Sequence, residues 1–498
     1  MEADGLATPE VFLSKGDRRL EDNYYTVIIG NNGTGKSRFV SSLVSVFRGF
    51  DKKRRRGVGK GEYSLSYWKN GDIYKFEKKA GKRDGKKRTD RSLNAEEREE
   101  VLEKPSKIIA VSSAISDKFP LDGFRRKGFE VSKKDNIYEY LGPRSVIGAS
   151  TRALMDRAIT ALIGNIGNIE YNESYRHIFS YLDYEPVVKL SYRLVWPGEL
   201  KGILSEPTVD RFVKGLSDYA SRRESFRGRS ISKALEVYSA EYLQEISDTY
   251  INILSNSEKE SWSKFYSLMI NFSLKNVERE KSKLGDEEKR LYTLLEELRR
   301  FDLVRGPEVS LYKKNGSEFD FSDASSGEAS ILSSLIALIP SVEDGSLLVI
   351  DEPEISLHPR WQYRYVELLD KILKSKKGCH VVIATHSHFI VSDLPLERSS
   401  VIHFKEGNGR VVDVDYVDAE TNGLSAEDVL LNIFGMPSTR NYYLSVELSK
   451  ALEMVASGKT DNELFFNIVR RLKGYIPYMK DVDPLKDALI TLSSLGGD

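Results

Sequence analysis

The sequence predicts an α/β fold with a binding site at one edge of a parallel sheet, and three segments carry this prediction. Residues 24–40, YYTVIIGNNGTGKSRFV, have the pattern of a β-branched strand, a glycine-rich turn and a helix start. Residues 345–359, GSLLVIDEPEISLHP, and 379–391, CHVVIATHSHFIV, contain short apolar runs typical of strands buried in a parallel sheet. Because ligands of open α/β sheets bind at the carboxyl ends of strands, we expect the three segments to meet there.

The glycine-rich turn is the first element of the expected site. Residues 30–37 fit the pattern G-x-x-x-x-G-K-[ST] directly after a strand, which predicts a phosphate-binding loop. Glycines let backbone N–H groups close around phosphate oxygens, the lysine reaches the β- and γ-phosphates, and the last hydroxyl is offered to Mg²⁺. The alternative is a plain turn with a surface lysine. We expect ATP and Mg²⁺ as cofactors, with nucleotide contacts from Gly30, Asn31, Asn32, Gly33, Thr34, Gly35, Lys36 and Ser37.

The other two strands supply the chemistry at their ends. We expect Asp351 to hold Mg²⁺, directly or through water, together with Ser37, and Glu352 to polarise the attacking water. His386 follows the third strand and is expected to reach the γ-phosphate. The alternatives are two helix-capping acids and a structural histidine. Glu352 and His386 are therefore the predicted catalytic residues.

A serine-rich turn, FSDASSGEASIL at residues 321–332, precedes the acidic strand. A hydroxyl, bare N–H groups and a helix that begins near Glu328 would together make an anion site. The simpler alternative is that Ser325 only caps this helix. The residues expected to contact nucleotide here are Ser325, Ser326, Gly327 and Glu328.

The order of these motifs resembles the ABC-type ATPase heads of the SMC and recombination-repair class. The order is phosphate loop, long insertion, Ser-x-Gly turn, acidic strand and histidine strand. The resemblance implies that Ser325 and Gly327 are the signature serine and glycine, with Glu328 in place of the usual glutamine. In that class the turn of one subunit covers the γ-phosphate held by the other. The resemblance therefore implies a head-to-tail homodimer, or a higher homo-oligomer, with ATP between its heads.

Two positions depart from that class. His358 stands in the loop where an aspartate is usual, and the surrounding SLHPRWQ is similar to recombination-repair and overcoming-lysogeny-defect ATPases. The glutamine that usually follows another strand is not evident. Ser112 and Ser113, within KIIAVSSAISDKFP at residues 107–120, fill its place, which leaves direct contact of this loop with Mg²⁺ open.

Four regions follow from this reading. Residues 1–142 and 302–418 form the N- and C-terminal lobes of a split ATPase head. Residues 143–301 form a mostly helical insertion, because apolar residues recur there at helical spacing, either as an arm or lid or as core packing. Residues 419–498 form a helical C-terminal region.

A basic hairpin is expected within residues 51–91, where 16 basic residues stand against 6 acidic ones. Tyr63, Leu65 and Tyr67 alternate along a strand, and Asn70-Gly71 has the composition of a hairpin turn. The basic runs at its ends favour binding to the phosphate backbone of nucleic acid, and a solvated charged loop is the alternative.

The bulk composition limits the remaining classes. The chain has 498 residues, zero formal net charge and one cysteine, Cys379, which excludes a disulfide framework and a cysteine-based zinc site. No apolar run approaches the roughly 20 residues that span a bilayer. The first residues, MEADGLATPE, lack a signal-peptide core, so we expect a cytoplasmic protein without a membrane association.

The C-terminal region favours one family. Residues 423–498 begin with a Ser425-x-x-Asp428 cap pattern. They resemble the tail after the head in Septu (PtuA-like) and retron-associated ATPases of bacterial antiphage defence. That family pairs with a separate HNH nuclease, and some members with a reverse transcriptase and its DNA–RNA product. The resemblance implies such partners here, since no nuclease site is evident in this chain.

The leading hypothesis is thus an ATP-hydrolysing sensor and regulatory subunit that controls a partner nuclease through ATP-dependent dimerisation. One alternative is a repair-type ATPase that clamps duplex DNA, or one like the overcoming-lysogeny-defect ATPases. Another is a nucleotide-binding scaffold with little turnover, against which Glu352 argues. A transporter ATPase is the least favoured reading.

Overall fold

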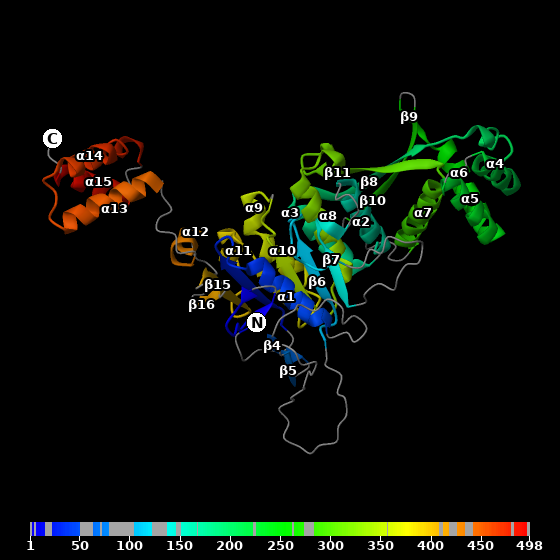
Figure 1. The fold of residues 1–498 in the computed structure, drawn as a ribbon. Helices are drawn as coiled ribbons and strands as arrows, with labels where there is room; N and C mark the ends of the chain where they lie inside the picture. Colours follow the sequence, from blue (N-terminus) through cyan, green and yellow to red (C-terminus); the bar gives the residue numbers. More distant parts are fainter. Residues whose placement is uncertain are drawn as a thin grey trace, which may run out of the picture. The chain divides into compact units, whose positions relative to one another are not determined.

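The chain divides into two compact units, residues Met1–Asn422 and Gly423–Asp498, each with its own apolar core. Figure 1 shows the fold of the chain, a computed structural model. The residues that this structure describes are 2–3, 6–14, 22–49, 63–69, 72–78, 104–121, 137–145, 151–166, 168–222, 226–260, 263–272, 283–355, 357–407, 412–417, 426–433, 442–479 and 483–495.

A seven-stranded sheet forms the centre of the first unit, in the order β16-β15-β3-β14-β13-β6-β7. All its strands are parallel except β16 at one edge. The strands nearest the middle are buried along their length, which explains their continuous apolar sequences. The strands are β3 (Tyr24–Gly30), β6 (Ile108–Ser112), β7 (Tyr138–Leu141), β13 (Leu347–Asp351), β14 (His380–Ala384), β15 (Ser399–Glu406) and β16 (Val412–Val417).

The register of this sheet aligns the strand ends that carry the motifs. Asp351 at the end of β13 lies beside Ser112 of β6 on one side and Ala384 of β14 on the other. Ala384 in turn lies beside Ile28 of β3, two residues before Gly30. The glycine-rich turn, the acidic pair and the histidine loop therefore leave the sheet at the same carboxyl edge.

Helices cover the sheet and carry its motifs. Helix α1 (Lys36–Gly49) follows the glycine-rich turn and buries its apolar face on the sheet, where the ring of Phe39 meets the edge of Phe404 at 5.2 Å. Helix α8 packs on α2 and α3, and α3 also packs on α10. These helices are α2 (Thr151–Gly164), α3 (Ile169–Tyr181), α8 (Ser326–Leu338), α9 (Pro359–Tyr363), α10 (Tyr365–Ile372) and α11 (His388–Ser392).

A second, antiparallel sheet joins the two predicted regions on either side of residue 301. Its order is β12-β11-β8-β10-β9, and β8 pairs with β11 along most of its length. The insertion is mostly helical, but it also contributes three strands that the sequence analysis did not anticipate. The strands are β8 (Tyr184–Leu194), β9 (Glu258–Glu260), β10 (Ser263–Asn271), β11 (Val304–Lys313) and β12 (Glu318–Asp320).

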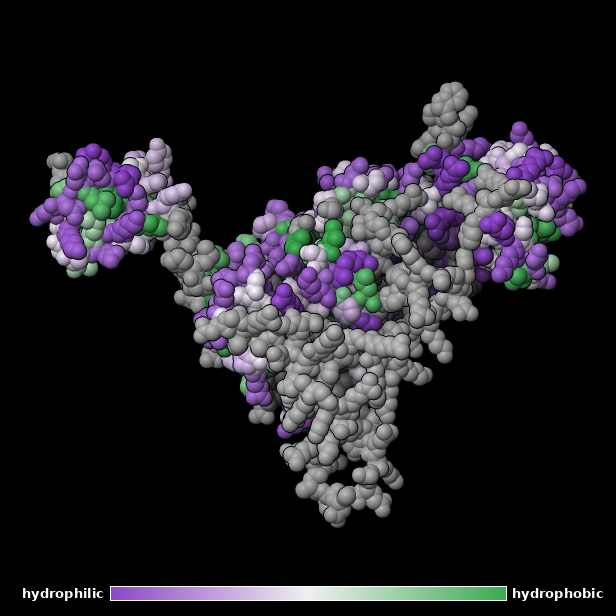
Figure 2. All heavy atoms as spheres, viewed as in Figure 1, coloured by the Kyte–Doolittle hydropathy of each residue, from purple (hydrophilic) through white to green (hydrophobic). Residues whose placement is uncertain are grey.

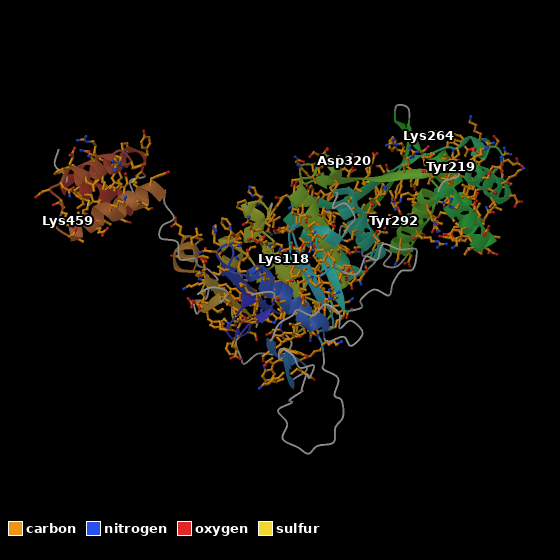
Figure 3. The ribbon with its side chains drawn as sticks, viewed as in Figure 1. Lys118, Tyr219, Lys264, Tyr292, Asp320 and Lys459 are labelled. Atoms are coloured by element: carbon orange, nitrogen blue, oxygen red, sulfur yellow. The ribbon has the colours of Figure 1, made fainter. Side chains whose placement is uncertain are left out.

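The helical repeat between residues 235 and 253 belongs to two helices. Ser239 separates them and accepts a hydrogen bond from the N–H of Tyr242 as an N-cap. In the same region, buried Asp302 accepts a hydrogen bond from the hydroxyl of Tyr219 at 2.9 Å. Figure 3 labels Tyr219 among the side chains of these helices. Leu294, Leu298 and Phe301, near the end of the insertion, are buried, as core packing requires. The helices here are α4 (Val209–Ser221), α5 (Phe226–Val237), α6 (Ala240–Ser255) and α7 (Lys283–Arg300).

A small hairpin of β4 (Tyr63–Lys69) and β5 (Asp72–Lys78) lies beside α1. The ring of Tyr67 meets the edge of Phe47 at 5.2 Å, while Trp68 on the opposite strand face is 60 % exposed. The predicted turn at residues 70–71 and the basic runs at 51–62 and 79–91 lie outside the described residues.

The second unit is helical. Helix α13 packs on α14, and α14 packs on α15 around Phe465, Ile468 and Leu472. Figure 2 shows apolar side chains at the centre of the visible face of this unit, with polar ones around them. The predicted Ser425 cap lies outside the described residues. The elements are α12 (Ala426–Asp428), a π-helix at Val429–Ile433, α13 (Tyr442–Ala456), α14 (Glu463–Lys473) and α15 (Pro484–Leu495).

Several short elements complete the description. None of the helices in the described part of the chain is both long and apolar enough to cross a membrane. The short elements are strands β1 (Glu2–Ala3) and β2 (Leu6–Ala7) and 3₁₀ turns at Pro143–Ser145, Gly198–Leu200, Phe321–Asp323, Ile339–Ser341 and Ile476–Tyr478.

Candidate nucleotide site

The glycine-rich turn joins β3 to α1 with a backbone that needs glycine. Gly30 has φ +150°, and a Cβ at this position would lie 2.2 Å from the carbonyl oxygen of Phe404. Gly33 has φ +86°, in the left-handed region that favours glycine. The side chains of Asn31 and Asn32 are exposed. The turn therefore brings backbone groups, not bulky side chains, to the edge of the sheet.

Lys36 is folded back into this turn. Its ammonium group is 4 % exposed and donates hydrogen bonds to the carbonyl oxygens of Gly30 at 2.8 Å and Asn31 at 3.0 Å. The Thr34 hydroxyl also donates to Asn31, at 2.9 Å. Burial lowers the pKa of Lys36 to about 8, although nearby carboxylates, Glu352 first, favour its charged form. A buried cation at a helix N-terminus is suited to a phosphate group.

Asp351 is a buried carboxylate with an unsatisfied oxygen. The residue is 2 % exposed, and its Oδ1 atom has no hydrogen-bond partner. Burial is the main cause that raises its pKa to about 7, a hydrogen bond with Ser37 lowers it, and the charge of Glu352 raises it further. An unsatisfied buried carboxylate oxygen is costly, and Mg²⁺ prefers oxygen ligands. Asp351 and Ser37 therefore fit a magnesium ion.

Glu352 and His386 lie next to each other. Glu352 has φ +49°, and its N–H donates to the carbonyl oxygen of Ala384 at 2.8 Å, which ties the end of β13 to β14. The imidazole Nε2 of His386 lies 4.0 Å from a carboxylate oxygen of Glu352. Burial, and then the charge of Lys36, lowers the pKa of His386, so its neutral form is favoured. Both side chains remain about 30 % exposed, which leaves them accessible to substrate.

Glu354 is a site residue that the sequence analysis missed. Its carboxylate accepts hydrogen bonds from the Thr385 hydroxyl at 2.8 Å and from the backbone N–H of His386 at 2.5 Å. Burial raises its pKa, and these hydrogen bonds lower it. The sequence feature that could have identified Glu354 is its position as a third acidic residue, three positions after Asp351, in the loop that follows the strand.

The loop after β6 also holds an unexpected acid. Ser112 lies beside Asp351 in the sheet, and its hydroxyl accepts from the N–H of Ala114 at 3.1 Å. Farther along this loop, the buried carboxylate of Asp117 is paired with Arg144 and accepts from the Tyr140 hydroxyl. The negative charge of Asp117 contributes to the raised pKa of Asp351. This loop thus supplies a charged group near the acidic strand end, where a glutamine is usual.

The serine-rich turn starts helix α8 as a reciprocal cap. The Ser325 hydroxyl accepts from the N–H of Glu328 at 3.2 Å and donates to its carboxylate at 2.9 Å. That carboxylate also accepts from the N–H of Ser325, at 3.0 Å. Gly327 is buried and Ser325 is exposed. The capping alternative is therefore present in this structure, and a role for the turn towards a second subunit stays a prediction.

His358 also serves as a helix cap. Its Nδ1 accepts from the N–H of Arg360 at 3.2 Å at the start of α9. The side chain is exposed and begins the helix that follows the acidic loop.

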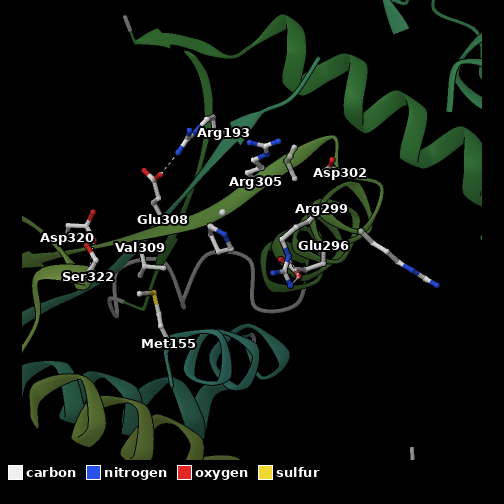
Figure 4. Close-up of a pocket in the computed structure, with 14 residues that line it drawn as sticks. Met155, Arg193, Glu296, Arg299, Asp302, Arg305, Glu308, Val309, Asp320 and Ser322 are labelled. Carbon is white, nitrogen blue, oxygen red and sulfur yellow. Dashed lines mark hydrogen bonds and ion pairs between the residues drawn. The ribbon is translucent and has the colours of Figure 1, made fainter. Parts of the chain in front are cut away.

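A cavity of the first unit lies away from these strand ends (Figure 4). It has a volume of about 1130 Å³ and is lined by residues of β8, β11 and the end of α7, with Met155 of α2. Its charged side chains pair with one another, as Arg193 does with Glu308 at 3.4 Å. None of the lining residues belongs to the glycine-rich turn or to the ends of β13 and β14, so this cavity is distinct from the candidate nucleotide site.

Among the described residues, no group of three or more histidine, cysteine, aspartate or glutamate side chains has an arrangement that could hold a metal ion by itself. A magnesium ion at Asp351 and Ser37 would need further oxygen ligands, which nucleotide phosphates and water supply.

Comparisons with known proteins agree with this geometry. Residues 190–392 match a family model described as "AAA domain, putative AbiEii toxin, Type IV TA system". The match includes β13 and β14 but not the glycine-rich turn. The Septu protein PtuA of Bacillus thuringiensis is 26 % identical over 184 residues, which are 34 % of this chain and 45 % of that protein. The chain resembles the ABC/AAA-type ATPases of antiphage defence.

Two further relatives share shorter stretches with this chain. Protein ea59 of phage lambda is 27 % identical over 152 residues, 30 % of this chain and 26 % of that protein. The retron Vc95 probable ATPase of Vibrio cholerae is 25 % identical over 123 residues, 22 % and 23 % of the two chains. The chain thus spans less than half the length of each of the curated relatives named here.

Two solved SMC head domains also align with the chain. One, from Pyrococcus furiosus, carries an extended coiled coil bound to the C-terminal domain of ScpA. It has 13 % identity and a TM-score of 0.30, and the alignment covers 79 % of this chain and 90 % of that one. The other, from Pyrococcus yayanosii, has 13 % identity, a TM-score of 0.28 and coverage of 82 % and 95 %.

Proposed function

We propose that the first unit binds ATP with Mg²⁺ and hydrolyses it. The observation that carries this proposal is the convergence of Lys36, Asp351, Glu352 and His386 at one edge of the parallel sheet. A scaffold that only binds nucleotide needs the lysine but not a partly exposed carboxylate beside a neutral imidazole.

Each group has one task in the proposed reaction. Lys36 leaves the carbonyl oxygens of its own turn and donates instead to the β- and γ-phosphates of ATP. Asp351 and Ser37 would hold Mg²⁺, which neutralises charge on the phosphates when bound. Glu352 accepts a hydrogen bond from the attacking water and orients it in line with the γ-phosphate. The neutral imidazole of His386 donates to a γ-phosphate oxygen, where charge is redistributed in the transition state.

Glu352→Gln tests this assignment, because the amide keeps the size of the side chain and removes its basicity. We expect kcat for phosphate release to fall about 10²- to 10⁴-fold, the range for a lost general base, with ATP affinity unchanged. Lys36→Ala should lose ATP binding itself, measured with a fluorescent ATP analogue. Equal rates of phosphate release from wild type and Glu352→Gln would contradict the catalytic role.

We further propose that the chain is the sensor and regulatory subunit of an antiphage complex. The relatives named for Septu and retron systems support this assignment. In the proposed cycle, ATP joins two heads through the Ser325 turn, and the closed state controls a separate nuclease partner of the HNH class. A reverse transcriptase with its DNA–RNA product is a further partner if the system is a retron.

A tagged chain purified from its native host tests the partners. Mass spectrometry and sequencing of the eluate should identify a nuclease, and in a retron a reverse transcriptase with small DNA. Lys36→Ala in the same host should abolish protection against phage. A chain that comes down without any effector, or intact protection by the variant, would contradict the regulatory role.

The alternative proposal is a repair-type ATPase that clamps duplex DNA. The hairpin of β4 and β5 favours it, because Trp68 is 60 % exposed there and lysine-rich sequence flanks both strands. This reading requires tight, ATP-dependent and salt-sensitive binding of duplex DNA by the purified chain alone. Binding that is weak, or independent of ATP, would remove this alternative.

A further inference from the structure

One carboxylate joins the loops that follow β13 and β14. Glu354 lies three residues after Asp351, yet both of its oxygens bind the neighbouring loop. One accepts from the hydroxyl of Thr385 at 2.8 Å and the other from the N–H of His386 at 2.5 Å. Because β13 and β14 pair in parallel register, the two loops leave the sheet side by side. The carboxylate therefore fixes one loop relative to the other.

The surroundings make this link costly to break. Glu354 is half-buried, and a carboxylate withdrawn from water in this way is stable only when its oxygens are hydrogen-bonded. Hydrogen bonds to a charged acceptor are also shorter and stronger than those between neutral groups. The charges that act on it include Lys36, which is attractive, and Glu352 and Asp351, which are repulsive. Both hydrogen-bond donors that reach this carboxylate from another segment belong to the loop that contains His386.

A second hydrogen-bonded connection holds the other side of His386. The N–H of Ser387 donates to the Thr385 hydroxyl at 2.9 Å, and the Ser387 hydroxyl donates to the side chain of Gln362 at 2.7 Å. Gln362 in turn donates to the carbonyl oxygen of Leu357 at 2.9 Å. The residues on both sides of His386 are thus tied to the segment that follows β13.

We propose that Glu354 is a positioning residue: it holds the loop after β14 so that the imidazole of His386 stays beside the carboxylate of Glu352. This inference rests on the proposed hydrolysis of ATP. It adds to the site a residue, Glu354, that acts through His386 and is not among the proposed nucleotide contacts. The observed separation of His386 Nε2 and Glu352 is 4.0 Å. A displacement of about 1 Å in such a pair is enough to cost about 10²-fold in rate.

Two substitutions of Glu354 separate the effect of its hydrogen bonds on the position of the His386 loop from the effect of its negative charge. Glu354→Ala removes both acceptors and should lower kcat for phosphate release about 10- to 100-fold while ATP affinity stays within about threefold. Glu354→Gln can still accept from the His386 N–H and can donate its amide hydrogen to the Thr385 hydroxyl, so it should keep kcat within about threefold of wild type. Equal losses in the two variants, or an unchanged kcat in Glu354→Ala, would overturn the proposal.

A double-mutant cycle tests whether Glu354 acts through His386. His386→Ala alone should lower kcat, and adding Glu354→Ala should then lower it by less than about threefold, because the positioned group is already absent. Multiplicative losses in the double variant would show an independent effect of Glu354 and overturn the proposal.

Amide hydrogen exchange supplies a readout without turnover. Loss of the Glu354 acceptor should speed exchange at the N–H of His386 in Glu354→Ala, whereas Glu354→Gln should keep the wild-type rate. Exchange in the buried strand β6 of the first unit is the internal control for the stability of that unit. Unchanged exchange at His386 in the alanine variant would contradict the positioning role. If the wild-type chain releases no phosphate above background, the proposed hydrolysis fails instead, and the exchange result still reports on the link.

Discussion

Two charged side chains at the edge of the parallel sheet have hydrogen bonding that suits a charged ligand. Lys36 donates to the carbonyl oxygens of its own turn, and Asp351 keeps one oxygen without a partner. A phosphate would give the ammonium group of Lys36 an anionic partner, and a magnesium ion would give the carboxylate of Asp351 a cationic one. The residues of the site therefore favour binding of the two together.

Asp117, which forms an ion pair with Arg144, should be one of the residues whose substitution most lowers the free energy of unfolding. The Asp117 side chain is fully buried and also accepts from Tyr140, so Asp117→Ala removes the carboxylate that pairs with Arg144 and leaves the Tyr140 hydroxyl without this acceptor. We expect a loss of about 3–5 kcal/mol in the free energy of unfolding, measured by urea denaturation. Lys371→Ala, which breaks an exposed pair with Glu367, is the control and should cost about 0.5 kcal/mol or less. Comparable losses would contradict the buried-pair argument.

Cys379 should react slowly in the folded chain. The residue is 1 % exposed, and burial raises the pKa of its thiol, so the neutral form predominates at about pH 8. Since the thiolate is the reactive form, alkylation by iodoacetamide should be at least about 10²-fold slower than in the chain unfolded with guanidinium. It is the chain's single cysteine, so mass spectrometry reads it without ambiguity. Rapid alkylation of the folded chain would contradict the burial.

At the scale of elements, the turn before helix α8 has one observed role, as a cap, and one proposed role, towards a second subunit. Ser325 and Glu328 satisfy each other's free groups and thereby start the helix, which any helix with this pattern would do. The same turn leaves an exposed hydroxyl next to a helix N-terminus, where an anion is favoured. A stability measurement alone cannot separate the two roles, so a matched helix cap is needed.

Ser239, the N-cap of α6, provides that match. Ser325→Ala and Ser239→Ala should each lower the free energy of unfolding by about 1 kcal/mol, the usual cost of a lost cap. In the Glu352→Gln background, which retains ATP, only Ser325→Ala should also lose ATP-dependent self-association, measured by light scattering. Dimers that persist in Ser325→Ala, or that disappear equally in Ser239→Ala, would contradict a role of the turn in joining two heads.

At the scale of the whole molecule, the chain consists of two units with separate cores. The first unit includes both sheets and every residue of the candidate nucleotide site. The second unit buries its own apolar cluster around Phe465, Ile468 and Leu472 within three helices. Since every residue of the candidate nucleotide site comes from the first unit, the proposed hydrolysis of ATP belongs to that unit.

Removal of the second unit tests this division. A chain that ends at Asn422 should remain folded, with a cooperative unfolding transition, and should release phosphate at a rate within about threefold of the full chain. Circular dichroism and a phosphate assay make the comparison, and Glu352→Gln in the shortened chain is the control for contaminating activity. Aggregation or loss of turnover in the shortened chain would contradict independent function of the first unit.

The sequence by itself determined the local parts of the site. Residues 30–37 are contiguous, and their glycines impose the turn whatever surrounds it. The apolar runs before Asp351 and His386 likewise identified strands that a parallel sheet buries on both faces. Sequence alone also indicated that these ends lie together, because parallel strands present their carboxyl ends at the same edge.

Only the tertiary structure decided the contacts between distant segments. It set β14 between β3 and β13 and paired Asp117 with Arg144. It also brought the carboxylate of Glu354 within hydrogen-bonding distance of the His386 loop. It also joined β8 and β10 of the insertion to β11 in one antiparallel sheet. Local patterns could not reveal these contacts, because a side chain's partner across strands depends on strand order and register, and both are set by burial of the whole core.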